Sequence, residues 1–192
     1  MTEKEKMVAG EWFNPIDPEL AEDRRRATRL THRLNVTLCD HDEAYRATLR
    51  ELCPEMKGFI RAPFFCDYGY TISVGEGTFI NFDCVFIDLA PIRIGRRCQI
   101  APKVQLLTAH HPFDAAERAT SREVGRPITI DDDCWLGGGV IVCPGVHIGA
   151  RSVIGAGAVV TKDIPADSLA VGNPARILRK LTKTDTPNPP TL

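Results

Sequence analysis

The sequence lacks an excess of charge of either sign: 24 Lys and Arg residues stand against 25 Asp and Glu residues, and the formal net charge is −1. Without a basic excess, the chain is not expected to bind nucleic acid or anionic lipid. No apolar run approaches the ~20 residues that a membrane-spanning helix needs. The opening MTEKEKMVAGEW is charged where a secretory signal peptide has an apolar core. We therefore expect a cytoplasmic protein with no nucleic-acid and no membrane partner.

Closely spaced metal ligands and disulfide patterns are also absent. The seven cysteines are odd in number and include no CxxC pair, which disfavours a disulfide framework and a zinc ribbon. His110 and His111 are adjacent, and two adjacent imidazoles cannot easily reach one ion in tetrahedral geometry. No GxxxxGK[ST] loop is present to bind a nucleoside triphosphate. The sequence therefore predicts no metal site.

The first part of the chain reads as a small helical segment. Apolar residues at helical spacing predict one helix over residues 17–37 and a second over residues 40–52. Asp17 before Pro18 has the form of an N-cap followed by proline in the first turn. We interpret the arginines of the first helix as a solvated face. They are Arg24, Arg25, Arg26 and Arg29.

A different pattern begins after residue 70, where an apolar residue recurs at every sixth position with one two-residue slip and one gap. A strand period interrupted by regular corners makes a prism-shaped solenoid, in which each turn buries its apolar residues against the next. The repeat positions are Val74, Ile80, Phe86, Ile94, Ile100, Leu106, Ile130, Leu136, Val142, Ile148, Ile154 and Val160. Four positions after each lies another inward candidate, and Cys84, Cys98 and Cys134 in these slots are interpreted as packing residues.

One long loop interrupts the solenoid at residues 107–129, and loops of this length in a compact domain usually carry function. His110 and His111 lie where the loop leaves the solenoid. An imidazole titrates near neutrality and suits removal of a proton from an alcohol. Gly138 leaves room for a narrow ligand along the solenoid wall. Cations near the C-terminus, including Arg176 and Arg179, form either a polar cap or contacts to phosphates of a long cofactor.

Seven sequence segments carry a resemblance to a known family. They are EKEKMVAGEWF, CDYGY, INFDCVFIDLAPIRIG, AHHP, ITIDDDCWLGGGVIVCPGVHIG, VIGAGAVVTKDIP and VGNPARILRKL. Over residues 3–181 the chain resembles the hexapeptide-repeat transferases of the maltose O-acetyltransferase group, which also holds galactoside and nodulation-sugar acetyltransferases. The resemblance implies a mainly β fold: a left-handed parallel β-helix over residues 59–181. A helical segment of the maltose acetyltransferase type (1–58) precedes it, and a disordered tail (182–192) follows.

The resemblance also implies an acetyl-CoA-dependent O-acetyltransferase that moves an acetyl group directly to a sugar hydroxyl. His111 matches the catalytic histidine, the general base, and Asn81 matches an asparagine that lies beside it from a neighbouring subunit and binds acetyl-CoA. Family members are homotrimers with active sites at the subunit interfaces. The other matched positions are Gly138, Ala156, Thr161 and Lys162 along the pantetheine arm, Arg176 and Arg179 near the nucleotide phosphates, and Asp67 and Asp88 at the acceptor site.

Two departures from the galactoside enzymes favour an acceptor of the maltose or glucose type. Pro15 stands where those enzymes carry an acidic residue near the N-terminus, and Leu89 stands where they carry a second acidic residue. Two alternatives stay open. One is an acetyltransferase for a non-sugar alcohol, such as serine or an antibiotic, and the other is a non-catalytic hexapeptide scaffold that binds CoA or a partner.

Overall fold

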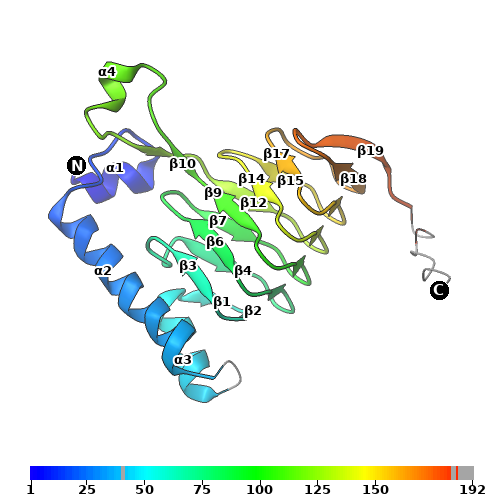
Figure 1. Cartoon of the computed structure of the whole chain (residues 1–192), viewed down its shortest axis with the longest axis horizontal. Coiled ribbons are helices and arrows are strands. Elements are labelled where there is room, and N and C mark those ends of the chain that lie inside the picture. The colour runs from blue at the N-terminus through cyan, green and yellow to red at the C-terminus, as the bar shows by residue number, and fades with distance from the viewer. Residues whose placement is uncertain (40–41, 183–184, 186–192) are drawn as a thin grey trace.

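The computed structural model describes residues 1–39, 42–182 and 185, so most of the predicted tail lies outside the described residues. The N-terminal helices are α1 (Glu3–Ala9), α2 (Pro18–His32), the π-helical turn η1 (Arg33–Thr37) and α3 (Glu43–Leu52). The predicted helix over residues 17–37 is confirmed as α2 continued by η1, and Asp17 caps it by accepting the N–H groups of Glu19 and Leu20. The second predicted helix is α3. Figure 1 shows α2 and α3 at one end of a stack of strands.

The strands form a solenoid of about six turns with three faces, each a sheet whose solenoid strands are parallel. Face 1 is β1 (Glu55–Met56), β4 (Ile72–Val74), β7 (Ile92–Ile94), β12 (Ile128–Ile130) and β15 (His147–Ile148). Face 2 is β2 (Phe59–Ile60), β5 (Phe79–Ile80), β8 (Gln99–Ile100), β13 (Trp135–Leu136), β16 (Val153–Ile154) and β18 (Ser168–Val171), with antiparallel β19 (Arg176–Lys180) added at its end. Face 3 is β3 (Phe64–Cys66), β6 (Cys84–Ile87), β9 (Gln105–Leu107), β14 (Ile141–Val142) and β17 (Val159–Val160).

The core of the solenoid consists of the residues that the repeat predicts. Every repeat position from Val74 to Val160 is buried. Their strand partners also follow the repeat, and Ile94 pairs directly with Ile130 across the gap. The long loop therefore leaves and re-enters the solenoid within a single turn, and the stacking of the core continues without interruption.

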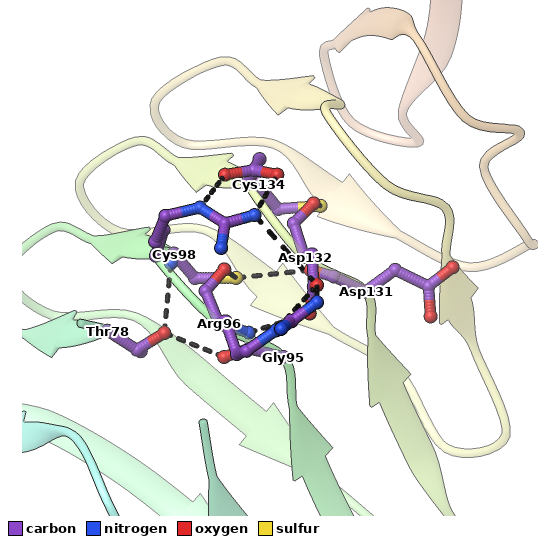
Figure 2. A network of polar contacts seen from close by, with 9 residues as sticks. Thr78, Gly95, Arg96, Cys98, Asp131, Asp132 and Cys134 are labelled. Carbon is purple, nitrogen blue, oxygen red and sulfur yellow. Dashed lines mark hydrogen bonds and ion pairs between the residues drawn. The ribbon is translucent and has the colours of Figure 1, made fainter. Parts of the chain in front are cut away.

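The edge where face 1 meets face 2 explains two of the three cysteines at the small inward positions, Cys98 and Cys134. The third, Cys84, is buried at the start of β6, where its thiol donates to the carbonyl of Ala101 at 3.4 Å. One hydroxyl or thiol in each turn donates to a backbone carbonyl of the next turn: Thr78 to Gly95 at 2.7 Å, Cys98 to Asp131 at 3.1 Å, Cys134 to Gly149 at 3.3 Å and Ser152 to Pro165 at 2.9 Å. Figure 2 shows the contacts of Thr78 and Cys98 in this row. It also shows the pairing of Arg96 with Asp132, in which a guanidinium nitrogen lies 2.8 Å from a carboxylate oxygen. These thiols are packed and hydrogen-bonded, which confirms their interpretation as packing residues.

The long loop is attached to the N-terminal segment. It contains β10 (Ala109–His110), α4 (Ala115–Arg118) and β11 (Val124–Gly125), and β10 and β11 pair antiparallel. Phe13 and Glu123 exchange two backbone hydrogen bonds, of 2.9 and 3.1 Å. Beneath them, Met7, Phe13, Leu20, Tyr68 and Leu89 form a second, smaller apolar cluster. In Figure 1, α1 and the loop with α4 accordingly lie at the same end of the molecule.

Across residues 1–39, 42–182 and 185, no helix combines the length and the apolar character that a bilayer crossing demands.

Candidate functional site

The site residues expected from the resemblance lie mainly along two edges of face 3. Asn81, Gly138 and Ala156 follow the face 2 strands β5, β13 and β16, which places them on the edge between faces 2 and 3. Gly138 and Ala156 occur in successive levels of this edge, where the N–H of Gly157 donates to the carbonyl of Gly138 at 2.9 Å, and the level of β8 separates Gly138 from Asn81. We call this row the Asn81 edge.

Gly138 has an environment unlike that of its neighbour Gly137. A Cβ added to Gly137 would lie 2.6 Å from the backbone nitrogen of Ala156, so packing inside the chain excludes a side chain there. A Cβ on Gly138 would meet only the carbonyl oxygen of Pro102, at an ordinary 3.5 Å. Packing within the chain therefore does not require glycine at position 138. The missing side chain instead keeps the outside of the Asn81 edge clear.

The second row lies on the edge between faces 3 and 1. Because parallel strands all end at the same edge of a sheet, the residues after β3, β6, β9 and β17 gather there. Asp67, Asp88, His111, Thr161 and Lys162 belong to this row, which we call the His111 edge. At ~3.3 Å per residue, the four residues of β6 separate the two edges by roughly 13 Å. A single chain therefore holds His111 and Asn81 on opposite sides of face 3.

His111 itself directly follows β10 and is half exposed. Its Nε2 lies 3.9 Å from Oε1 of Glu123, on the returning strand of the loop. The ring of His110 packs edge-on against Phe113, with ring centroids 5.1 Å apart. Of the two adjacent histidines, His111 therefore combines exposure with a carboxylate neighbour, as a general base for an external hydroxyl requires.

Asp88 is fully buried, and its carboxylate binds backbone groups of the same chain. Its carboxylate accepts hydrogen bonds from the N–H groups of Asp67 and Tyr68, both at 2.9 Å, and of Gly69 at 2.8 Å. The hydroxyl of Thr71 lies 2.7 Å from Oδ2. Burial raises the pKa of Asp88, and these hydrogen bonds oppose the rise. Asp88 thus holds the segment that presents Asp67, while its direct contact with an acceptor stays a prediction.

The carboxylate of Asp67 differs from that of Asp88 in its hydrogen bonding. In the part of the chain that the structure describes, no donor forms a hydrogen bond with its carboxylate, and the residue is partly buried. Burial, together with the nearby negative charges of Asp88 and Glu123, raises the pKa of Asp67 to about 6, against the opposing charge of Arg24. An acceptor hydroxyl could donate to this unfilled carboxylate.

Arg24, whose charge opposes the rise in the pKa of Asp67, is a residue near the candidate site that the sequence interpretation missed. One guanidinium nitrogen donates to the hydroxyl of Tyr68 at 2.8 Å, and another donates to the carbonyl of Pro15 at 2.6 Å. Arg26 is also partly buried and donates to the carbonyl of Glu51. The interpretation of this cluster as a solvated face is therefore wrong for Arg24 and Arg26, and holds for the exposed Arg25 and Arg29. Tertiary packing of α2 makes the distinction, since all four arginines look alike in sequence.

The C-terminal arginines lie on β19. Arg176 begins this strand at the end of the Asn81 edge, where it pairs with Val171 and the N–H of the preceding Ala175 donates to the carbonyl of Val159 at 2.8 Å. This strand is exposed throughout and pairs antiparallel with β18 at the end of face 2. Arg179 pairs with Asp185 at 2.8 Å, and the guanidinium of Arg176 donates to the neighbouring carbonyl of Ala175 at 2.9 Å. A role of these two side chains toward phosphates stays a prediction. Within the described residues, no cluster of three or more His, Cys, Asp or Glu side chains is arranged to hold a metal ion.

Comparisons with known proteins agree with this architecture. Residues 6–57 match the family described as the maltose acetyltransferase hexapeptide capping motif, and residues 127–162 match the bacterial transferase hexapeptide repeats. The chain is 45% identical over 178 residues to nodulation protein L of Rhizobium meliloti (strain 1021), an alignment that covers 92% of this chain and 97% of that protein.

Solved structures are similar over almost the whole chain. A maltose O-acetyltransferase from Clostridium difficile 630 has 46% identity and a TM-score of 0.91, covering 95% of this chain and 99% of its own. A hexapeptide-repeat acetyltransferase from Vibrio cholerae O1 biovar eltor, complexed with acetyl-coenzyme A, has 44% identity and a TM-score of 0.87, covering 95% and 100%. The predicted left-handed parallel β-helix is thereby confirmed.

Proposed function

The chain belongs to the hexapeptide-repeat acetyltransferases of the maltose acetyltransferase type, and on this basis we propose that it acetylates a sugar hydroxyl of the maltose or glucose type. The protein is an acetyl-CoA-dependent acetyltransferase. The observation that carries the sugar proposal is the His111 edge. An exposed imidazole there shares a site with Asp67, whose carboxylate has no hydrogen-bond donor within the described chain.

In the proposed reaction, the imidazole of His111 takes the proton of the acceptor hydroxyl while the hydroxyl oxygen attacks the thioester carbonyl carbon of acetyl-CoA. The carbon–sulfur bond then breaks, and the CoA thiolate leaves and takes up the proton from the imidazolium. The acetyl group passes directly to the sugar oxygen, so no covalent enzyme intermediate is needed. Carboxylates such as Asp67 suit an acceptor with several hydroxyls, because each can accept a hydrogen bond.

We further propose that the protein is a homotrimer in which the His111 edge of one copy meets the Asn81 edge of the next. The outward side chains of face 3 support this assembly, because they are almost all apolar: Phe65, Val85, Gln105, Ile141 and Val159. The corresponding row on face 1 is polar: Glu55, Ser73, Arg93, Thr129 and His147. An apolar sheet face between two halves of a site is expected to be covered by a second copy.

Two observations favour the cytoplasm as the compartment. All seven cysteines are free thiols, which fits a reducing environment. The co-substrate acetyl-CoA is an intracellular metabolite.

Acceptor-dependent release of CoA thiol from acetyl-CoA is expected with maltose and glucose, and more weakly with a β-galactoside. The acetyl group transferred to the sugar leaves one free thiol behind, which a thiol reagent detects. Serine and an amino-alcohol antibiotic serve as non-sugar acceptors in the same assay. Thiol release with these alone would overturn the sugar proposal. Absence of thiol release with every acceptor, together with retained binding of CoA, would favour the scaffold alternative.

Mixing two inactive variants is expected to restore activity, because the proposed site takes His111 and Asn81 from different copies. In trimers assembled at random from His111→Ala and Asn81→Ala chains, about a quarter of the interfaces would combine both native residues. Activity after co-refolding at equal amounts should therefore recover to about a quarter of the wild-type value. Either variant refolded alone is the control. Absence of recovery in mixed trimers would contradict a shared site.

A further inference from the structure

A cavity of about 560 Å³ lies between α3 and the beginning of the edge where face 1 meets face 2. Lys57 and Gly58 line it from the first solenoid turn, and Gly77 lines it from the second. Its volume is within the range of roughly 300–1,000 Å³ that is typical of small-molecule sites. The Asn81 edge and the His111 edge both border face 3, whereas this edge does not. The cavity is therefore distinct from the proposed acetyl-transfer site.

Gly77 leaves one wall of the cavity without a side chain. The residues that follow it at the same corner of later turns also have positive φ, of 56–62°, and all are charged: Arg97, Asp133, Arg151 and Asp167. They form ion pairs of 2.7 and 2.6 Å along the edge. A Cβ on Gly77 would lie 3.3 Å from Cγ of Arg97, which belongs to a long and flexible side chain. The corner thus accepts side chains in later turns, and glycine at position 77 keeps this wall open.

Apolar side chains form the floor of the cavity. Phe59 and Phe79 lie on the outward side of face 2, in neighbouring turns. Their rings stack, with centroids 6.3 Å apart and planes inclined by only 8°. The buried side chains of Leu49 and Met56 complete the floor. Stacked aromatic rings that line a cavity favour a ligand with a planar ring of its own.

Three exposed cations line the same cavity. Arg46 and Arg50 lie one helical turn apart on α3, and Lys57 follows β1. Arg50 already pairs with Glu43 at 2.7 Å. Within the described chain, the side chains of Arg46 and Lys57 form neither a hydrogen bond nor an ion pair, and none of the described lining residues is acidic. Two cations without a partner beside a cavity favour an anionic ligand.

We propose that this cavity binds a nucleoside phosphate, with the phosphate between Arg46 and Lys57 and the base against Phe59 and Phe79. A phosphate monoester carries a charge of about −1.5 to −2 at neutral pH, so one group matches both cations. A guanidinium binds phosphate oxygens in bidentate geometry, and nucleobases stack on aromatic rings. A carboxylate would leave one of the two cations without a partner. The site goes beyond the proposed acetyl transfer and does not depend on the identity of the acceptor.

The test is isothermal titration calorimetry of the intact protein with AMP, adenosine and inorganic phosphate. One equivalent of CoA is present throughout, so that the co-substrate site is already filled. AMP should bind about tenfold more tightly than adenosine or phosphate, because it alone uses both halves of the cavity. In the double variant Arg46→Gln with Lys57→Gln, the Kd for AMP should rise about tenfold for each charge-assisted hydrogen bond lost. Phe79→Leu should weaken binding of AMP and adenosine and leave phosphate binding unchanged.

The double variant Arg25→Gln with Arg33→Gln is the matched control. It removes the same two charges from exposed arginines of the N-terminal helices that do not line the cavity. Its affinity for AMP should equal that of wild type. No binding of AMP to wild type, or equal AMP affinity in wild type and in Arg46→Gln with Lys57→Gln, would overturn the inference. Equal weakening in both double variants would also overturn it, because the effect would then come from net charge alone.

Discussion

Replacing His111 by alanine is expected to lower kcat for acetyl transfer about 10²–10⁴-fold, the usual contribution of a general base. The reason is that, in the proposed reaction, the half-exposed imidazole at the root of the loop takes the proton of the acceptor hydroxyl. The KM for acetyl-CoA should change little, because the base acts on the acceptor hydroxyl. Initial rates of thiol release at saturating acceptor measure the effect.

His147→Ala is a closely matched control for this experiment. His147 has 51% side-chain exposure against 49% for His111, and it also pairs with a carboxylate, that of Asp131 at 3.0 Å. It lies on the outward side of face 1, in β15. This variant should keep wild-type kcat. Undiminished turnover in His111→Ala would exclude His111 as the base.

Asp88→Ala is expected to destabilise the protein by about 3–5 kcal/mol, because it leaves several buried N–H donors without an acceptor. The donors belong to Asp67, Tyr68 and Gly69, so the segment that carries Asp67 should lose its conformation. Urea unfolding followed by circular dichroism measures the loss. Asp42→Ala is the control, since Asp42 is exposed and its side chain makes no capping hydrogen bond to α3. Equal midpoints for the two variants would contradict this role of Asp88.

Asp88→Asn adds a pH-dependent version of the same test. The amide oxygen can still accept two hydrogen bonds, so the loss should be smaller than in Asp88→Ala. Burial raises the pKa of Asp88, which means that the folded state binds this proton more tightly than the unfolded state. Wild-type stability relative to Asp88→Asn should therefore increase as the pH falls from neutrality toward the ordinary aspartate value of 3.8.

The six-residue repeat covers most of the solenoid but not its beginning. The first turn contributes Met56, Ile60 and Phe64, which are spaced by four residues and therefore do not match a six-residue repeat. Their strands nevertheless pair in parallel with β4, β5 and β6. A prism face can be shortened at its end, because the terminal turn stacks on one neighbour and is covered on the other side by helices such as α3.

The sequence by itself determined the stacking register of the solenoid, since a buried residue at every sixth position leaves one way to align successive turns. It also placed His110 and His111 at the root of a loop that interrupts the repeat, and the family resemblance then selected His111 as the predicted base. Only the tertiary structure decided which charged side chains meet there. Arg24, Asp67 and Glu123 come from a helix, a solenoid edge and a returning loop strand. Their proximity depends on how Phe13 and its apolar neighbours attach the N-terminal arm to the loop, and no local spacing encodes a contact between segments so far apart in the chain.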